Sequence, residues 1–378
     1  TLNQLYSLML RHNLLLAVRS FMRFKSSFFI NLIGLTAGLV CTLLIYLWVM
    51  DELSMDQFHT KNDRLFRVME YQQYADHVMT TWATPGLLAE TLKEEFPEIE
   101  HAATITWVAS NTLSVGESNI KAEGFYVGSD FFQLFSYELL DGDASQVLND
   151  KKNIVISKSL AEQLFENSEN AMGKVVEYEH NKEFVVSGVF EGTPRNSSYQ
   201  FDFVLSFEAF KDENDWVLSW GSNGPGTIVT LIEGANHQAV SDKIADFVKT
   251  KNEQSNVTLF LRHYSDLYLN GRYENGKEAG GRIEYVQLFS LIAIFILVIA
   301  CINFMNLSTA RASRRTKEVG IKKAIGAKQW GLILQYLSES LFITFFSMLL
   351  ALFLIWLFLP QFNEITDKQI TLSIDGVM

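Results

Sequence analysis

The sequence predicts a membrane protein in which α-helical transmembrane spans carry one large external domain of the α+β class with two lobes. Two observations support this prediction. Three long runs contain no charged residue, and acidic and basic residues are divided unequally between the segments that separate these runs. The average composition, with 48% hydrophobic and 20% charged residues, hides this division.

The uncharged runs comprise residues 28–50, 286–307 and 340–359, which contain 23, 22 and 20 residues. A helix needs about 20 apolar residues to cross the hydrocarbon core of a bilayer, so each run is long enough to span it. One such run could be a buried helix of a soluble protein, but three runs bordered by charged residues argue against that interpretation. The first run is also longer than the roughly 7–15 apolar residues of a cleaved signal peptide.

The charges between the runs predict the topology. Residues 1–27 contain four basic residues and no acid, and residues 308–330 contain seven basic residues and one acid. Residues 51–285 contain 19 basic and 38 acidic residues, a net charge of −19. Because positive loops stay in the cytoplasm, we expect the N-terminus and the loop 308–339 inside, and the domain 51–285 and the tail 360–378 outside. This arrangement fits the inner membrane of a bacterium, with the domain in the periplasm.

The first 27 residues predict an amphipathic helix on the cytoplasmic membrane surface. Leu14, Val18 and Phe21 recur at helical spacing, and Arg11 and Arg19 are available for anionic lipid headgroups. The alternative is a positive flank that only fixes the topology.

Gly34 and Gly38 form a small-xxx-small pattern in the first span. Such a pattern lets two helix backbones approach closely. The sequence leaves open whether the partner is another helix of the same protein or a second copy.

The external segment alternates strand and helix signals. Thr84-Pro85 predicts the start of a helix that ends before Pro97, and Ser159 with Glu162 predicts a capping box. Residues 174–178 and 183–190 alternate as two paired strands, and residues 201–262 form a second lobe. Both cysteines, at positions 41 and 301, lie in spans, so the domain must be stable without disulfides.

No motif for catalysis, metal binding or nucleic-acid binding is found. The phosphate-binding loop of ATPases is missing, and the glycine-rich stretch 221–226 predicts a plain turn. The seven histidines are scattered without metal-ligand spacing. We therefore expect no enzyme, no cofactor and no metal on this chain. Glu339 lies directly before the third run, where we expect a contact at the helix boundary rather than a proton relay.

The basic loop 308–339 is the most informative segment. It predicts a short amphipathic helix on which Val319, Ile321, Ala324 and Ile325 line one side and the lysines the other, with bends at Gly320 and Gly326 before and after it. The loop is either a simple positive-inside flank or a docking element that fits a groove of a soluble partner. For the second case the predicted contact residues are Lys317, Glu318, Val319, Gly320, Ile321, Lys322, Lys323, Ile325 and Gly326.

Several separate stretches carry a family resemblance. Residues 301–310 and 317–327 resemble the signature of MacB/FtsX-type ABC-transporter permeases, and residues 31–38 and 51–59 are similar to the N-terminal part of the same family. Further external stretches, at 130–136, 156–161 and 186–190, are similar too. The resemblance extends over nearly the whole chain.

The resemblance implies a fold with a first span, a two-lobed periplasmic domain and three further spans, so a fourth span is missing after Met378 and we expect a partial sequence. It implies a separate cytoplasmic ABC ATPase, which binds ATP and Mg²⁺ and contacts the basic loop. It also implies a second permease copy or half, and a periplasmic adaptor or outer-membrane partner. ATP-driven movement of the spans would then move the external domain.

Two functions compete at this stage. The first is a permease subunit that couples ATP hydrolysis to periplasmic movement, for efflux, for lipoprotein or peptide export, or for control of cell-wall hydrolases. The second is a membrane-anchored sensor whose acidic domain binds an external ligand. The short basic loop favours the first, because a sensor usually continues into a cytoplasmic signalling domain. No residue identifies the substrate.

Overall fold

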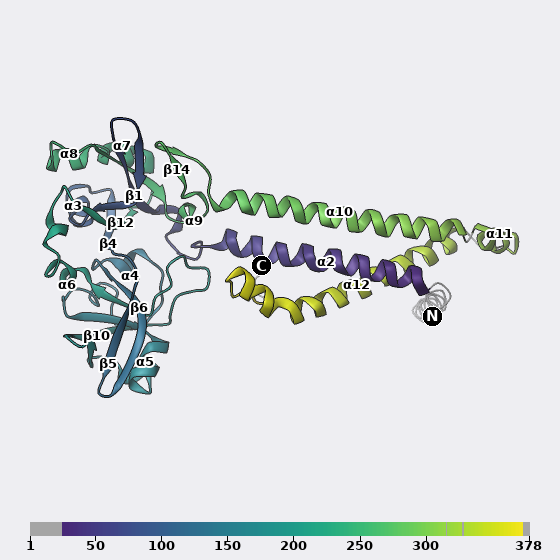
Figure 1. Cartoon of the computed structure of the whole chain (residues 1–378), viewed down its shortest axis with the longest axis horizontal. Helices are drawn as coiled ribbons and strands as arrows, with labels where there is room; N and C mark the ends of the chain where they lie inside the picture. Colours follow the sequence, from purple (N-terminus) through teal and green to yellow (C-terminus); the bar gives the residue numbers. More distant parts are fainter. Residues whose placement is uncertain (1–24, 315, 327–328, 373–378) are drawn as a thin grey trace. The chain divides into compact units, whose positions relative to one another are not determined.

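The structure is a computed structural model that describes residues 25–314, 316–326 and 329–372. It divides into two compact units, one of residues 52–284 and one that combines the preceding and following segments (Figure 1). We refer to them as the external unit and the membrane unit. The predicted amphipathic segment 1–27 lies almost wholly outside the described residues.

The described part of the membrane unit consists of three long apolar helices and one short helix. They are α2 (Lys25–Ser54), α10 (Arg282–Arg314), the short α11 (Thr316–Ala324) and α12 (Gln329–Thr366). Three of them, α2, α10 and α12, are long and apolar enough to cross a membrane. The chain is therefore a membrane protein with transmembrane helices, as predicted.

Each spanning helix is longer than its uncharged run, because charged residues at the ends of a run do not end a helix. The stretch 308–339, which we predicted as a loop, is consequently mostly helical. At the other end α12 continues through Pro360 to Thr366. Glu339 is buried inside α12, ten residues after its start, so its predicted position at a helix boundary is wrong.

Helices α2 and α10 pack side by side in antiparallel directions (Figure 1). The ring of Trp48 meets that of Phe289, with centroids 5.2 Å apart, and the Thr42 hydroxyl donates to the carbonyl of Ala293 (3.3 Å). A Cβ atom added to Gly38 would lie 2.5 Å from the Cβ of Ala300. The glycine therefore permits this close approach of two helices within one chain.

The external unit contains one large mixed sheet of 13 strands. Its strands are β1 (Leu65–Gln73), β2 (Val78–Thr81), β3 (Ala83–Pro85), β4 (Ile99–Ile105), β5 (Ala109–Val115), β6 (Ser118–Val127), β7 (Leu139–Asp141), β8 (Asn153–Ser157), β9 (Val175–Tyr178), β10 (Lys182–Phe190), β11 (Phe203–Ser206), β12 (Asn223–Leu231) and β13 (Val257–His263). A separate hairpin pairs β14 (Tyr273–Glu274) with β15 (Lys277–Glu278).

The helices of the external unit are short. They are α3 (Leu88–Glu95), α4 (Phe131–Leu134), α5 (Lys158–Phe165), α6 (Phe207–Lys211), α7 (His237–Ile244), α8 (Phe247–Lys251) and α9 (Asp266–Asn270), with 3-10 turns η1 (Asn62–Arg64), η2 (Ser168–Asn170) and η3 (Asp215–Leu218). Apolar residues of α3, α7 and α8 pack on one part of the sheet, and those of α5 on the other.

The sheet order is β11-β8-β10-β9-β5-β6-β4-β12-β1-β13, and an additional pairing of β11 with β6 closes six strands into a ring. One half of the unit is this ring, whose strands come from residues 109–206. The other half contains β4, β12, β1 and β13. Because β1 pairs with both β12 and β13, the beginning and the end of the domain belong to the same half.

This topology corrects several predictions. Residues 201–262 do not form a lobe of their own, since β11 belongs to the ring and β12 and β13 to the other half. The predicted turn 221–226 enters β12 at Asn223. Thr84 is in β3 and donates its hydroxyl to the carbonyl of Pro225 (3.2 Å) instead of capping a helix. Ser157, not Ser159, caps α5 by accepting from the N–H of Leu160.

The prediction of paired strands at 174–178 and 183–190 is confirmed. Strands β9 and β10 are antiparallel, with Lys182 opposite Tyr178 and Val185 opposite Val175. Their apolar residues, among them Val176, Phe184 and Val186, are buried in the core of the ring. Alternation of apolar and polar residues identified these strands because one face of them is buried.

Candidate functional site: the coupling helix and the domain joint

The short helix α11 contains most of the predicted contact residues. Lys317, Glu318, Val319, Gly320 and Ile321 lie in its first six positions. They are followed by Lys322 and Lys323, and Ile325 and Gly326 come directly after the helix. We call residues 316–326 the coupling helix.

The coupling helix exposes two isoleucines. Ile321 is 62% exposed and Ile325 is 81% exposed, and a spacing of four residues places both on one side. Val319, which we expected on the same side, is half-buried. Two positions along a helix turn through about 200°, so Val319 belongs to the opposite side. Among the described residues of the coupling helix, the large exposed apolar side chains are therefore Ile321 and Ile325, with the smaller exposed Ala324 between them in sequence.

The two glycines differ in their roles. Gly326 has φ +96 and follows the last turn, where its N–H donates to the carbonyl of Lys323 (3.0 Å). A residue in this left-handed conformation commonly ends a helix, and glycine adopts it without steric cost. Gly320 lies inside the helix, so the predicted bend before the helix at this position is wrong. Apart from its chain neighbours and the backbone of its own helix, no described residue has an atom within 4 Å of the position that a Cβ of Gly320 would occupy.

A second site, at the end of α2, was not among the predicted site residues. The loop with Asn196 and Ser198 covers the last turn of this helix. The Asn196 side chain donates to the carbonyl of Ser54 (2.9 Å), and the Asn196 carbonyl accepts from the N–H of Asp56 (2.7 Å). The Asp56 carboxylate accepts from the N–H of Ser198 (2.8 Å). These bonds satisfy backbone groups that a helix end leaves without partners.

The conformation and the burial of Asp56 are both energetically unfavourable. Its backbone has φ 58, which is unusual for a residue other than glycine. Its side chain is buried, and burial raises the pKa of the carboxyl group above its ordinary value, although the hydrogen bonds from Ser198 oppose that rise. Residues at such cost persist where the surrounding structure needs them.

His59 anchors the chain three residues further on. It is 3% exposed, and its ring contacts the rings of Phe135, Tyr137 and Tyr264. Its Nδ1 accepts a hydrogen bond from the N–H of Ser136 (3.2 Å), so this nitrogen carries no proton. Burial lowers the pKa of His59 to about 4. The imidazole is therefore neutral and structural at neutral pH.

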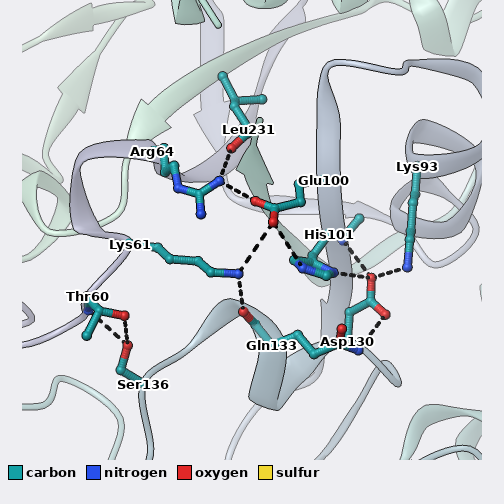
Figure 2. Close-up of polar contacts among 11 residues, drawn as sticks. Thr60, Lys61, Arg64, Lys93, Glu100, His101, Asp130, Gln133, Ser136 and Leu231 are labelled. Atoms are coloured by element: carbon teal, nitrogen blue, oxygen red, sulfur yellow. Dashed lines mark hydrogen bonds and ion pairs between the residues drawn. The ribbon is translucent and has the colours of Figure 1, made fainter. Parts of the chain in front are cut away.

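A charged network then fixes the segment after His59 to two other elements (Figure 2). Lys61 donates to the carbonyl of Gln133 in α4 (2.9 Å), and its Nζ lies 3.9 Å from Glu100 in β4. Arg64 pairs with Glu100 and donates to the carbonyl of Leu231 (2.9 Å). The chain that leaves α2 is thus attached to both α4 and β4.

His101 and Asp130 extend the network inward (Figure 2). Nδ1 of His101 lies 3.5 Å from Asp130, and its Nε2 lies 3.6 Å from Glu100. Asp130 also pairs with Lys93 and accepts from the N–H of Ala102 (3.2 Å). Burial, followed by the charge of Lys61, lowers the pKa of His101. Lys61, Arg64 and Lys93 share the two carboxylates of Glu100 and Asp130, and such mutual pairing suits a structural network more than a catalytic centre.

Among the described residues, no group of three or more His, Cys, Asp or Glu side chains is arranged to hold a metal ion. The two sites are an exposed apolar helix in the membrane unit and, in the external unit, the hydrogen-bonded segment that follows α2. Both are suited to the transmission of a movement along the spanning helices.

Comparison with protein families agrees with this organisation. Residues 28–247 match the MacB-like periplasmic core domain, and residues 290–376 match the C-terminal domain of FtsX-like permeases. The chain belongs to the family of ABC-transporter permeases that combine these two domains.

Individual relatives are distant. The chain is 26% identical over 255 residues to the macrolide export ATP-binding/permease protein MacB of Neisseria meningitidis, which covers 64% of this chain and 36% of that protein. It is 24% identical over 282 residues to the MacB protein of Salmonella choleraesuis, with 67% and 40% covered. The chain thus spans well under half the length of these curated relatives.

A solved structure is also similar. A domain of a permease protein from Porphyromonas gingivalis has 20% sequence identity and a TM-score of 0.46, and the match covers 55% of this chain and 93% of that domain.

Proposed function

We propose that this chain is the permease subunit that couples ATP hydrolysis by a separate cytoplasmic ATPase to a conformational change of the external unit. The observation that carries the proposal is the pair of exposed isoleucines, Ile321 and Ile325, on a short helix between two spanning helices. Two apolar side chains on one side of a helix are suited to a groove on a partner protein.

The charges around the isoleucines support the same proposal. Lys317, Lys322 and Lys323 lie within the same short helix, and a basic segment between spans belongs in the cytoplasm. In the proposed orientation, the acidic external unit would lie in the periplasm and the spans in a bacterial inner membrane. The partner would then supply the ATP and Mg²⁺ sites.

Movement of the coupling helix would reach the external unit through the spanning helices. Helices α10 and α12 flank the coupling helix along the chain, and α2 packs against α10. At its outer end α2 is attached to the external unit by Asp56, His59 and the charged network. A displacement of the coupling helix would be carried by the spanning helices that flank it along the chain.

Further partners follow from family membership. We propose a second permease copy or half in the membrane, and a periplasmic adaptor or outer-membrane protein in contact with the external unit. The substrate is not specified by any described residue, so efflux, lipoprotein or peptide export and control of cell-wall hydrolases are equally compatible with this mechanism.

The proposal is tested by co-purification from membranes with a cytoplasmic ABC ATPase of the same organism. Replacement of Ile321 and Ile325 by Glu should prevent co-purification, since loss of two anchor residues costs on the order of 2 kcal/mol each or more. The matched control is Ile232→Glu in the external unit, where the side chain is 43% exposed. If the double variant retains the ATPase as well as the control does, the coupling helix is not the docking element. If the unaltered chain binds no ATPase, the alternative of an anchored sensor is favoured.

A further inference from the structure

The last turn of α2 contains two consecutive acids, Asp51 and Glu52. Negative charges are unfavourable at the C-terminal end of a helix, because the helix dipole is negative there. Each acid has a cationic partner that offsets this cost. In the membrane unit, Asp51 pairs with Lys368 (2.8 Å). In the external unit, Glu52 lies 3.5 Å from Arg282.

Glu52 is the more unusual of the two acids, because it is only 1% exposed. Its Oε1 accepts a hydrogen bond from the hydroxyl of Tyr268 (3.1 Å) and faces Nη1 of Arg282. A buried carboxylate is tolerated only when charges and hydrogen bonds compensate for its removal from water. The position of Glu52 thus depends on these two side chains.

Arg282 contacts both Glu52 and Tyr268. Its Nη1 donates to the hydroxyl of Tyr268 (3.0 Å), and its Cζ lies 4.8 Å from the centroid of the Tyr268 ring. Glu52, Tyr268 and Arg282 therefore each contact the other two. We call these three residues the helix clamp.

The clamp joins elements that are far apart in sequence. Glu52 is in the last turn of α2, Arg282 is the first residue of α10, and Tyr268 is in α9. Helix α9 directly follows β13, which pairs with β1 along seven residues. The outer end of α2 and the first turn of α10 are thus held together and linked through α9 to β13, the strand at one end of the sheet order.

We propose that the helix clamp is the element that makes the outer ends of α2 and α10 move together, so that a displacement of the spans is passed through α9 to the external unit. The proposal deepens the function proposed above and rests on it. The three residues have a positioning role. They need not contact a substrate or the ATPase.

The experiment measures movement of the external unit directly. The full chain, with Cys41 and Cys301 replaced by Ser, is labelled with a spin probe at Lys174→Cys, an exposed position. It is reconstituted with its ATPase, and the distance between probes on two copies is measured with and without ATP. Glu52→Gln, Tyr268→Phe and Arg282→Gln are compared with the unaltered chain. The control is Lys249→Gln, which removes an exposed ion pair to Asp246 in the same unit.

In clamp variants we expect ATP hydrolysis to continue while the ATP-dependent change in distance is reduced roughly fivefold or more, as for loss of an allosteric coupling. The double variant Glu52→Gln/Arg282→Gln should be little worse than either single variant, because both remove one interaction. Tyr268→Phe keeps the ring and removes only the hydroxyl. If the charge variants do not accumulate in the membrane, the distance change measured in Tyr268→Phe alone tests whether the clamp transmits movement.

The proposal is overturned if all variants that accumulate show the full change in distance. The clamp alone fails if coupling-helix variants abolish the change and clamp variants do not. If the coupling-helix variants also leave hydrolysis and movement intact, the proposed function itself is wrong. An equal loss of movement in Lys249→Gln would show a general sensitivity of the external unit, and would also count against the clamp.

Discussion

The side-chain amide of Asn196 donates a hydrogen bond to the backbone carbonyl of Ser54, 2.9 Å away, and so closes the end of the first spanning helix. The two residues are 142 positions apart in sequence. Asn196→Ala removes this bond while the N–H of Gln57 still donates to the Ser54 carbonyl (3.2 Å), so we expect the protein to be destabilised by about 0.5–1.5 kcal/mol. Thermal unfolding in detergent measures the change. The control is Asn181→Ala, in the exposed turn between β9 and β10. An equal effect of both substitutions would show that the bond to Ser54 is unimportant.

The contact of Gly38 with Ala300 predicts a specific rescue. Gly38→Ala places a methyl group 2.5 Å from the Cβ of Ala300 and should lower the stability of the membrane unit. Ala300→Gly in the same chain should restore it. Gly34→Ala should be milder, because only the flexible side chain of Asn303 is close. If Ala300→Gly fails to rescue Gly38→Ala and self-association is lost instead, the glycine faces a second copy.

Glu70 predicts a fall in stability with rising pH. It is fully buried on β1, accepts hydrogen bonds from Gln72 (3.0 Å) and Asn223, and burial raises its pKa from 4.5 to about 7. The folded state therefore binds more protons than the unfolded state between these pH values. The free energy of unfolding should fall as pH rises through this window, by up to about 1.4 kcal/mol per pH unit. Glu70→Gln should remove this slope.

For His59 we expect the opposite pH dependence of the free energy of unfolding. Its pKa is lowered from 6.5 to about 4, so the unfolded state binds more protons between these values. This contribution to stability is complete above pH 6.5 and is lost as pH falls toward 4. Because the windows of His59 and Glu70 overlap, their slopes oppose each other in the unaltered protein.

The two variants separate these slopes. In Glu70→Gln, stability should rise from pH 4.5 to 6.5, and in His59→Asn it should fall over the same range. The pH dependence of the thermal unfolding midpoint of each variant is the measurement. Parallel curves for both variants and the unaltered protein would contradict the assignment of these two groups.

The sequence alone predicted the spanning segments, because hydrocarbon thickness sets a minimum length of uncharged helix. It also predicted β9 and β10, whose alternation reflects one buried face. Both signals are local and repeat over many residues. Helix starts were less certain. Ser157 and Ser159 both precede α5, and only the hydrogen bond from Leu160 identifies the cap.

The hydrogen bonds of Asp56 and Asn196 at the end of α2 and the contacts of the helix clamp could not be predicted from spacing. Glu52 and Arg282 are separated by most of the external unit, and nothing in the pattern of either segment indicates that they meet. Asn196 lies in a stretch that only signals a turn. The sequence did contain one signal. Asp51 and Glu52 lie at the C-terminal end of a helix, where the helix dipole disfavours acids, so each of them is expected to need a cationic partner.

The central claim is that the coupling helix contacts the ATPase, and site-specific cross-linking in intact membranes tests it most directly. A photoreactive amino acid is placed at Ile325, and in a matched control at Ile232 of the external unit. The account predicts a cross-linked product between this chain and its ATPase from position 325 and none from position 232. Absence of that product at position 325, when the ATPase is present in the same membranes, would contradict it.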